Sequence, residues 1–237
     1  MTQTATRPAD TYSPTYFLAS VGSGGLTITF FMYLMFWVPH PDQPVPIFEN
    51  IAAAFGQGQL PMQIAIIVAM IGIAVFAFLN VKSLIWNLGQ LSKFKQTDAY
   101  KALKSSNGET QLLAMPLALA MTINVGFILG LVFVPNLWLV VEYLFPLALI
   151  GFVLVGLLAL KMIGQFLGRV LSSGGIFDVT ANNSFAQLLP AFALSMVAVG
   201  LSSPAAMSLS PTVVGTSLVL STFFGTIAAI YAALAAI

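Results

Sequence analysis

Most polar side chains inside the apolar runs of this sequence are hydroxyls and amides. Ser20, Ser23 and Thr27 occupy positions i, i+3 and i+7, so a helix would carry their hydroxyl groups on one face. Uncharged groups of this kind can replace part of an anion's hydration shell, which favours weak binding and fast release. We predict a polar pathway lined by eight residues: Ser20, Ser23, Thr27, Thr122, Asn124, Gln187, Ser195 and Ser202. The alternative is that small residues here only let helices pack closely.

Catalytic chemistry has almost no support in the sequence. There is no Cys, and the single His40 lies in a Pro-rich loop, which excludes thiolate chemistry and multi-histidine metal sites. No Ser/His/Asp set, paired carboxylates or metal-ligand spacing is present, so we expect no enzyme, no metal and no cofactor. The net charge of +1 gives no electrostatic argument for nucleic acid. Glu142, the one carboxylate within an apolar run, is either an interfacial anchor or a proton or cation site.

The stretch VGSGGLTITFF, residues 21–31, has three glycines within four positions, as phosphate-binding loops often do. A dinucleotide fingerprint also needs a preceding strand and a glycine three residues further on, and here an apolar span surrounds the glycines and Ile28 stands at that place. We therefore expect the glycines to permit packing or bending of a helix. Prolines within later spans free a carbonyl group and kink the helix. The predicted bending positions are Gly22, Gly24, Gly25, Pro116 and Pro190.

The elements that hold these residues are membrane-spanning helices. Hydrophobic residues make up 59% of the 237 residues and charged residues only 6%, with a mean hydropathy of +0.97. A soluble domain has roughly a quarter of its residues charged. We predict an all-α polytopic membrane protein with an N-terminal tail over 1–15 and a transmembrane domain over 16–237. Its six spans are expected at about 16–38, 61–90, 112–134, 137–171, 184–201 and 211–237.

The distribution of proline and glycine predicts two layers of helices. Kinked first, third and fifth spans alternate with long apolar segments, so we expect an inner layer of odd-numbered spans around a central pore and an outer layer of even-numbered ones. Two GxxxG patterns, Gly126–Gly130 and Gly164–Gly168, predict close helix packing.

All eight basic residues fall on one side of a six-span topology. The loops 39–60, 135–137 and 202–210 contain no Lys or Arg. By the positive-inside rule the N-terminus is cytoplasmic, and we expect a multi-pass protein of the bacterial cytoplasmic, or inner, membrane. The sequence stops in AAIYAALAAI without a polar flank, so we expect a truncated chain with further spans missing. The alternative is a last helix that ends flush with the interface.

Three stretches resemble the TehA-like family of tellurite-resistance and dicarboxylate transporters, which is related to the plant slow anion channels. They are YFLASVGSGGLTITFF in the first span, LLAMPLALAMTIN in the third, and GGIFDVTANNSFAQLLPAFALSM, which joins the fourth to the fifth. The stretch FFMYLMFWVPHP is similar to the TsoY subfamily, which includes selenoproteins. The sequence departs from the family in the first helix, where SVGSGG stands in place of the usual proline.

This resemblance implies ten helices built from five helical hairpins around a central pore, commonly assembled as a trimer. Pro116 and Pro190 would then kink inner helices, and Ser23, Thr27, Thr122 and Ser195 would lie near the pore. A phenylalanine of the ninth helix occludes the pore in the family, and a chain of six spans has no counterpart for it.

We therefore expect an anion channel, or an exporter of small oxyanions or organic anions. Its partners would be membrane lipid, small inorganic or organic anions and further copies of itself, without nucleic acid. The alternative, from a different class, is a non-transporting integral membrane subunit that anchors or packs against a partner complex.

Overall fold

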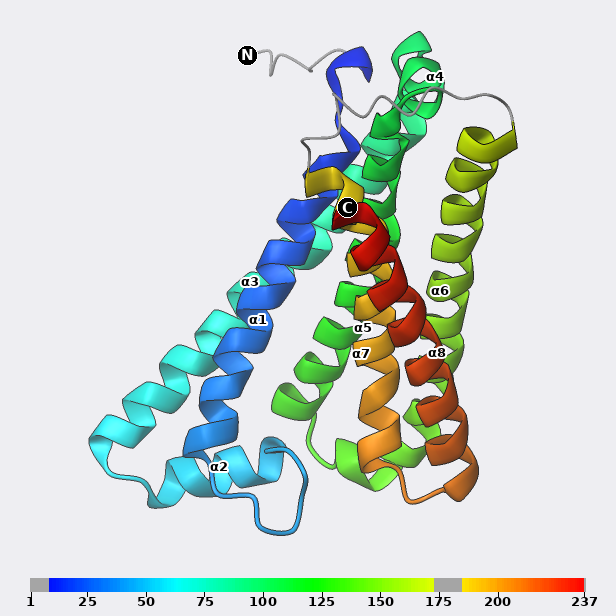
Figure 1. Ribbon diagram of the computed structural model, residues 1–237. Coiled ribbons are helices and arrows are strands. Elements are labelled where there is room, and N and C mark those ends of the chain that lie inside the picture. Colours follow the sequence, from blue (N-terminus) through cyan, green and yellow to red (C-terminus); the bar gives the residue numbers. More distant parts are fainter. Residues whose placement is uncertain (1–8, 173–184, 237) are drawn as a thin grey trace, which may run out of the picture.

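The computed structural model describes residues 9–172 and 185–236 (Figure 1). Almost all of these residues are helical, and none of them lies in a strand. Six helical segments are long and apolar enough to cross a membrane, which confirms the predicted all-α polytopic membrane fold. The segments are Pro14–Trp37, Leu60–Phe94, Asn107–Phe133, Leu137–Leu171, Phe185–Met207 and Pro211–Ala236.

Each span contains one long α-helix. The six are α1 (Phe17–Trp37), α3 (Leu60–Phe94), α5 (Ala114–Phe133), α6 (Val141–Ser172), α7 (Leu189–Met207) and α8 (Pro211–Ala236). Two short helices, α2 (Phe48–Gln57) and α4 (Asp98–Lys104), lie between spans. Short 3-10 helices complete the described chain: η1 (Ala9–Thr11), η2 (Pro14–Tyr16), η3 (Asn107–Leu113), η4 (Leu137–Val140) and η5 (Phe185–Leu188).

The observed bounds differ from the expected ones in three places. The third span begins earlier, because η3 precedes α5. The fifth continues to Met207, because α7 tolerates Pro204 in its interior. The segment 39–60, expected as a loop, contains α2, which buries Ile51. Residues 1–8 of the expected tail, the stretch 173–184 that carries part of the family resemblance, and Ile237 lie outside the described residues.

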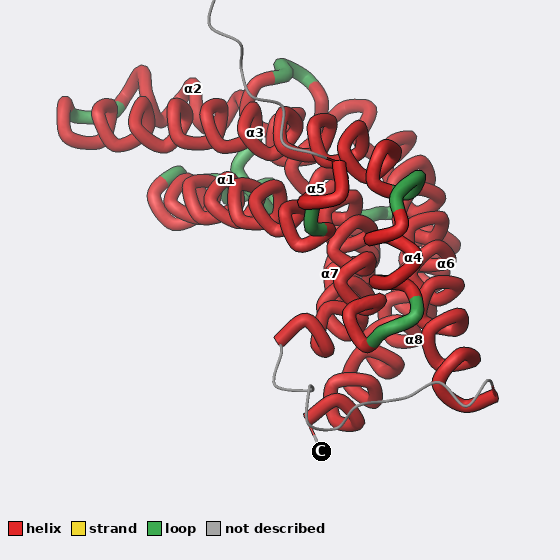
Figure 2. Tube along the Cα trace, turned by 90° about the horizontal axis from the view of Figure 1, so that it is seen from above, coloured by secondary structure: helices red, strands yellow, loops and turns green. Residues whose placement is uncertain are grey.

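The spans are arranged in a bent, two-layered row. Helix α5 packs against both α1 and α7, so the first, third and fifth spans form a continuous series. Helix α3 packs against α1, α6 against α5 and α7, and α8 against α7. Seen from above (Figure 2), α1 and α7 lie on the inner side of the bend and α3 and α6 on its outer side. Over the first five spans, this order agrees with the predicted inner and outer layers.

Phenylalanine rings seated on glycines hold three of the helix pairs together. A Cβ at these glycines would overlap the ring, so only glycine lets the partner helix approach this closely. The pairs are Gly72 with Phe30 (α3 and α1), Gly200 with Phe152 (α7 and α6) and Gly156 with Phe224 (α6 and α8).

The GxxxG patterns are not the motifs that pack. Within the described chain, nothing lies within 4 Å of the place where a Cβ would stand at Gly126, Gly164 or Gly168. A Cβ at Gly130 would meet Leu137, which follows in the same helical hairpin. Close helix packing through these patterns is therefore not found among the described residues, and Gly126 and Gly130 instead line an open groove between α5 and α6.

The two ends of the helical row carry opposite charges. All described basic residues lie toward the end that holds α4, at the top of Figure 1. The opposite end, where α2 lies, carries Asp42, Glu49 and Glu142 and no Lys or Arg. We call these the lysine-rich end and the acidic end. The basic residues that the sequence predicted on one side of the membrane thus lie toward one end of the helical row.

Candidate transport pathway

A cavity of about 310 Å³ opens between α1 and α7, near the acidic end. Its walls are Ile28, Phe31 and Met32 of α1 and a strip of α7 that includes Met196 and Ser203. Residues of α5 and α6 complete the lining. Because α1 and α7 lie on the inner side of the bend (Figure 2), this cavity belongs to the inner layer.

The lining of this cavity is uncharged and mostly apolar. Only two of its residues, Asn124 and Ser203, carry oxygen or nitrogen in the side chain. The Asn124 amide donates to Ala120 O at 3.2 Å and contacts Met196 Sδ at 3.6 Å. Of the eight predicted pathway residues, Asn124 is the one that lines the cavity. An ion here would meet few hydrogen-bond donors and long apolar walls.

Above the cavity, Ser20, Asn80 and Thr122 join α1, α3 and α5 through buried hydrogen bonds. The Asn80 Nδ2 group donates to Ser20 O at 2.8 Å and lies 3.0 Å from Ser20 Oγ. The hydroxyl of Ser20 donates to Asn80 O at 3.0 Å, and that of Thr122 donates to Asn80 Oδ1 at 3.0 Å. Asn80 and Ser20 are fully buried. Within the described chain these groups therefore fix the helix contacts, since an unpaired amide would be costly in hydrocarbon.

The other hydroxyls of α1 bond to their own helix. Ser23 Oγ donates to Ala19 O at 2.9 Å, and Thr27 Oγ1 donates to Ser23 O at 3.1 Å. Thr27 is fully buried, whereas Ser23 is half-buried. The hydroxyls of Ser20, Ser23 and Thr27 are thus all hydrogen-bonded to backbone carbonyls of α1 or α3.

The predicted residues of the fifth span lie in three different environments. Ser195 and Ser202 are exposed on α7, and the Ser202 hydroxyl donates to Val199 O at 2.7 Å. Gln187 is buried at the lysine-rich end, where its amide donates to Asn107 O at 3.1 Å and joins η5 to η3. Gln187 is therefore remote from Ser202, which stands near the other end of α7.

The three glycines of α1 are not equivalent. Gly24 is buried, and a Cβ there would overlap Met121 of α5 and lie 3.1 Å from Asn80 Nδ2. A Cβ at Gly22 or Gly25 would have nothing within 4 Å among the described residues. Gly24 is thus the position where α1, α3 and α5 need glycine for close approach.

Pro116 and Pro190 lie in the first turns of α5 and α7, and not in the helix interiors that the sequence predicted. Pro116 is the third residue of α5 and Pro190 the second residue of α7. Each follows a 3-10 helix, so the apolar run begins before the α-helix does. Proline is well tolerated in a first turn, where its missing N–H leaves no intrahelical bond unmade. The prolines that do lie inside helices are Pro146 of α6 and Pro204 of α7.

Glu142 anchors the connection between α7 and α8 at the acidic end. Its two carboxylate oxygens accept from the Ser208 hydroxyl and from Leu209 N, each at 2.7 Å. Of the two alternatives from the sequence, this geometry favours the anchor, because both oxygens are already hydrogen-bonded.

Sequence reasoning missed two asparagines that organise the α1–α3 contact. Asn80 and Asn87 are seven residues apart on one face of α3, and both are buried. The side-chain oxygen of Asn87 accepts from Tyr12 OH at 2.9 Å, and its amide donates to Tyr16 O at 3.2 Å. The available signal was an amide repeated at i and i+7 in an apolar helix, which predicts one polar seam.

Three comparisons with known proteins gave no match. No family model matches the chain, no curated protein is similar to it, and no solved structure resembles it. Within the residues that the structure describes, no group of three or more His, Cys, Asp or Glu could hold a metal ion. The function must therefore be argued from the arrangement of the helices and their polar groups.

Proposed function

We propose that this integral membrane protein is a transport protein that lets small anions cross the membrane along the inner layer of its spans. The observation that carries the proposal is the uncharged cavity between α1 and α7, since these helices lie on the inner side of the bend. A pathway without fixed charge binds its ion weakly, and an apolar constriction can close by excluding water.

The charge distribution supports an anion over a cation as the transported species. Seven basic residues of the described chain lie toward the lysine-rich end, where they raise the local concentration of anions. In the proposed orientation this end faces the cytoplasm, in agreement with the positive-inside rule. Asn124 and Ser203 would then offer N–H and O–H donors part-way along the route. Assembly into a ten-helix pore and a trimer, as the TehA-like resemblance implies, belongs to the same proposal.

One observation favours the alternative of a non-transporting subunit. The hydroxyls of Ser20, Thr27 and Thr122 are occupied by hydrogen bonds within or between helices, which is what a packing element requires. Under this alternative the cavity would be a contact surface for a partner's side chains.

The test is anion flux through the purified protein in liposomes. We expect chloride or nitrate efflux above that of empty liposomes, and Ser203→Trp should lower it at least tenfold by filling the cavity. The matched control is Ile150→Trp, which adds the same ring to the exposed outer face of α6 and should leave the flux unchanged. Wild-type flux no greater than that of empty liposomes would favour the non-transporting subunit. Equal flux from both variants would show that the ion does not pass this cavity.

A further inference from the structure

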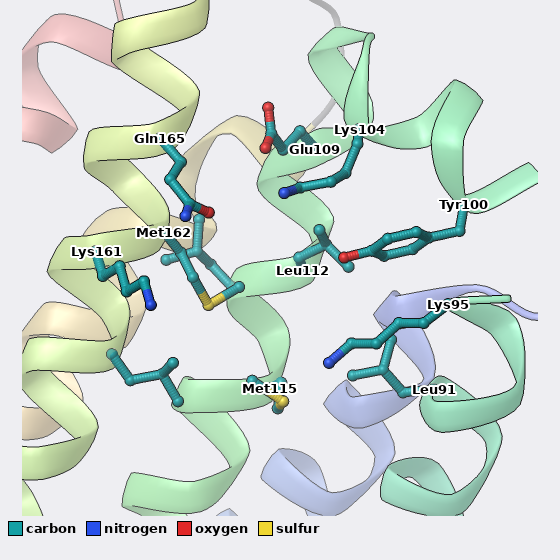
Figure 3. A pocket seen from close by; sticks show the side chains of 12 residues that line it. Leu91, Lys95, Tyr100, Lys104, Glu109, Leu112, Met115, Lys161, Met162 and Gln165 are labelled. Atoms are coloured by element: carbon teal, nitrogen blue, oxygen red, sulfur yellow. The ribbon is translucent and has the colours of Figure 1, made fainter.

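A second cavity, of about 210 Å³, lies at the lysine-rich end between α3, α4, η3 and α6. Lys95 follows α3, Lys104 ends α4, and Lys161 lies on α6. Figure 3 shows the three side chains extending toward the same space from these separate elements. No residue of α1 or α7 lines this cavity, and it shares no lining residue with the candidate pathway.

The charge in this cavity is not balanced by the described residues. The ion pairs of the described chain are Lys101 with Asp98, and Arg169 with Glu109 at 2.9 Å, so no carboxylate among the described residues lies within 4 Å of the three cavity lysines. Glu109 is the one acidic residue in the lining, and its Oε2 already accepts from Arg169 Nε. Three lysines and a single carboxylate, which already pairs with Arg169, leave a net positive charge around the cavity that a bound anion would offset.

Most of the other lining residues are apolar and lie among the lysines. Leu112, Met115 and Met162 face the cavity in Figure 3, and Leu158 of α6 is also part of it. Next to Lys161 on the same face of α6, Leu157 and Leu154 are exposed. The site thus combines a cationic rim with an apolar wall that continues along the outer surface of a membrane helix.

The depth of the lysines matches the polar headgroup region. Between Val141, where α6 begins at the acidic end, and Lys161 the helix rises about 30 Å, which is the thickness of the hydrocarbon core. Lys95 and Lys104 lie beyond α3 and at the end of α4, on the same side as Lys161. A phosphate at the rim would therefore sit at the level of the lipid phosphates.

Two neutral donors complete the rim. The Tyr100 hydroxyl and the Gln165 amide both line the cavity. Burial, and secondarily the charge of Glu109, raise the pKa of Tyr100 above its ordinary value, so its hydroxyl stays protonated and able to donate. Lysines with neutral donors around an apolar floor are the features of basic pockets that bind anionic lipid headgroups.

We propose that this cavity is a binding site for the phosphate group of an anionic phospholipid, with the lysines 95, 104 and 161 on the phosphate and the acyl chains along α6. This inference does not depend on the proposed transport function, because the two cavities share no lining residue. The same phosphate chemistry is offered by free inorganic phosphate, but the adjoining apolar wall favours the lipid.

Native mass spectrometry of the delipidated protein in detergent tests this site. Titration with phosphatidylglycerol and, separately, with phosphatidylcholine gives the association constant of the first lipid bound. We expect preference for phosphatidylglycerol, and Lys95→Gln with Lys161→Gln should weaken its binding about 25-fold, or about fivefold (about 1 kcal/mol) per lysine. Lys93→Gln with Lys101→Gln removes the same charge outside the cavity and should change the constant less than twofold. Gln165→Lys, which adds a fourth ammonium group, should tighten it.

Three outcomes would overturn the proposal. The first is no preference of the wild-type protein for phosphatidylglycerol. The second is equal weakening by the two double variants, which would assign the effect to general surface charge. The third is displacement of the bound lipid by millimolar inorganic phosphate, which would assign the site to the free anion. The variants are compared only when size-exclusion profiles and circular dichroism match the wild type; if the double variant fails this check, Lys161→Gln alone is tested against Lys93→Gln.

Discussion

Replacement of Gly24 by alanine should destabilise the protein even though alanine is the better helix former. The added Cβ would overlap Met121 Cγ, lie 2.8 Å from Met121 Sδ and lie 3.1 Å from Asn80 Nδ2. Met121 is buried in a cluster with Ala77 and Val125, so its side chain has little free space into which to shift. Inserting a methyl group into such a packed site costs about 1–3 kcal/mol.

Gly22 and Gly25 are matched controls, because they lie in the same helix and a Cβ there meets nothing within 4 Å. Alanine at either position should stabilise the helix by about 0.5–1 kcal/mol, and the same gain accompanies the change at Gly24. The difference between Gly24→Ala and Gly22→Ala therefore isolates the overpacking, at about 1–3 kcal/mol.

The measurement is the free energy of unfolding in mixed micelles, from titration with sodium dodecyl sulfate followed by circular dichroism. The reasoning requires Gly24→Ala to be about 1–3 kcal/mol less stable than either control. Equal stability of Gly24→Ala and Gly22→Ala would refute the close approach of α1 to α5 at this point.

Three further predictions follow from the polar contacts. Asn80→Leu should lower the free energy of unfolding by about 1–2 kcal/mol, because it removes hydrogen bonds to two other helices; Asn124→Leu, whose amide bonds mainly within its own helix, should cost less in the same unfolding assay. A double-mutant cycle of Arg169→Gln and Glu109→Gln should give a coupling of about 1–3 kcal/mol, since the pair is largely buried, and an additive double mutant would contradict it. Tyr100→Phe should make the free energy of unfolding less sensitive to alkali. The raised pKa of Tyr100 means that the folded state holds the phenol proton more tightly, so this stabilisation is present below pH 10 and is lost as pH rises through the folded-state pKa. Unchanged alkaline unfolding of the variant would contradict this.

The polar residues show how far helical periodicity alone can go. The spacing of Ser20, Ser23 and Thr27 places their hydroxyls on one side of α1, but it does not show which neighbouring helix packs against that side. Asn80, which is 60 residues further along the chain, accepts a hydrogen bond from Ser20. Ser20 therefore forms a helix contact and does not line a pathway. Asn80 could be seen in the sequence, but only the fold shows that its side-chain amide is hydrogen-bonded to Ser20 and Thr122.

The prolines and glycines show the same limit at the level of the backbone. Pro116 and Pro190 lie well inside apolar runs, yet 3-10 helices occupy the start of those runs and place both prolines in a first turn. Nothing in the local sequence separates a 3-10 turn from an α-helical one with the same residues. Likewise Gly164 belongs to a GxxxG pattern but has no close neighbour among the described residues. Gly200, which belongs to no such pattern, packs against the Phe152 ring of α6.

The sequence by itself determined the membrane fold and the charge difference between its two ends. Both follow from local stretches of sequence. A helix of about 20 apolar residues satisfies its own backbone hydrogen bonds in hydrocarbon, and basic residues in or beyond the same ends of the spans show which ends lie together. Only the tertiary structure decided which side chains meet. It buried Ser20 against Asn80, left a cavity between α1 and α7, and brought Lys95, Lys104 and Lys161 into one cavity. Those contacts join residues distant in the chain, and their geometry depends on which helix faces pack together.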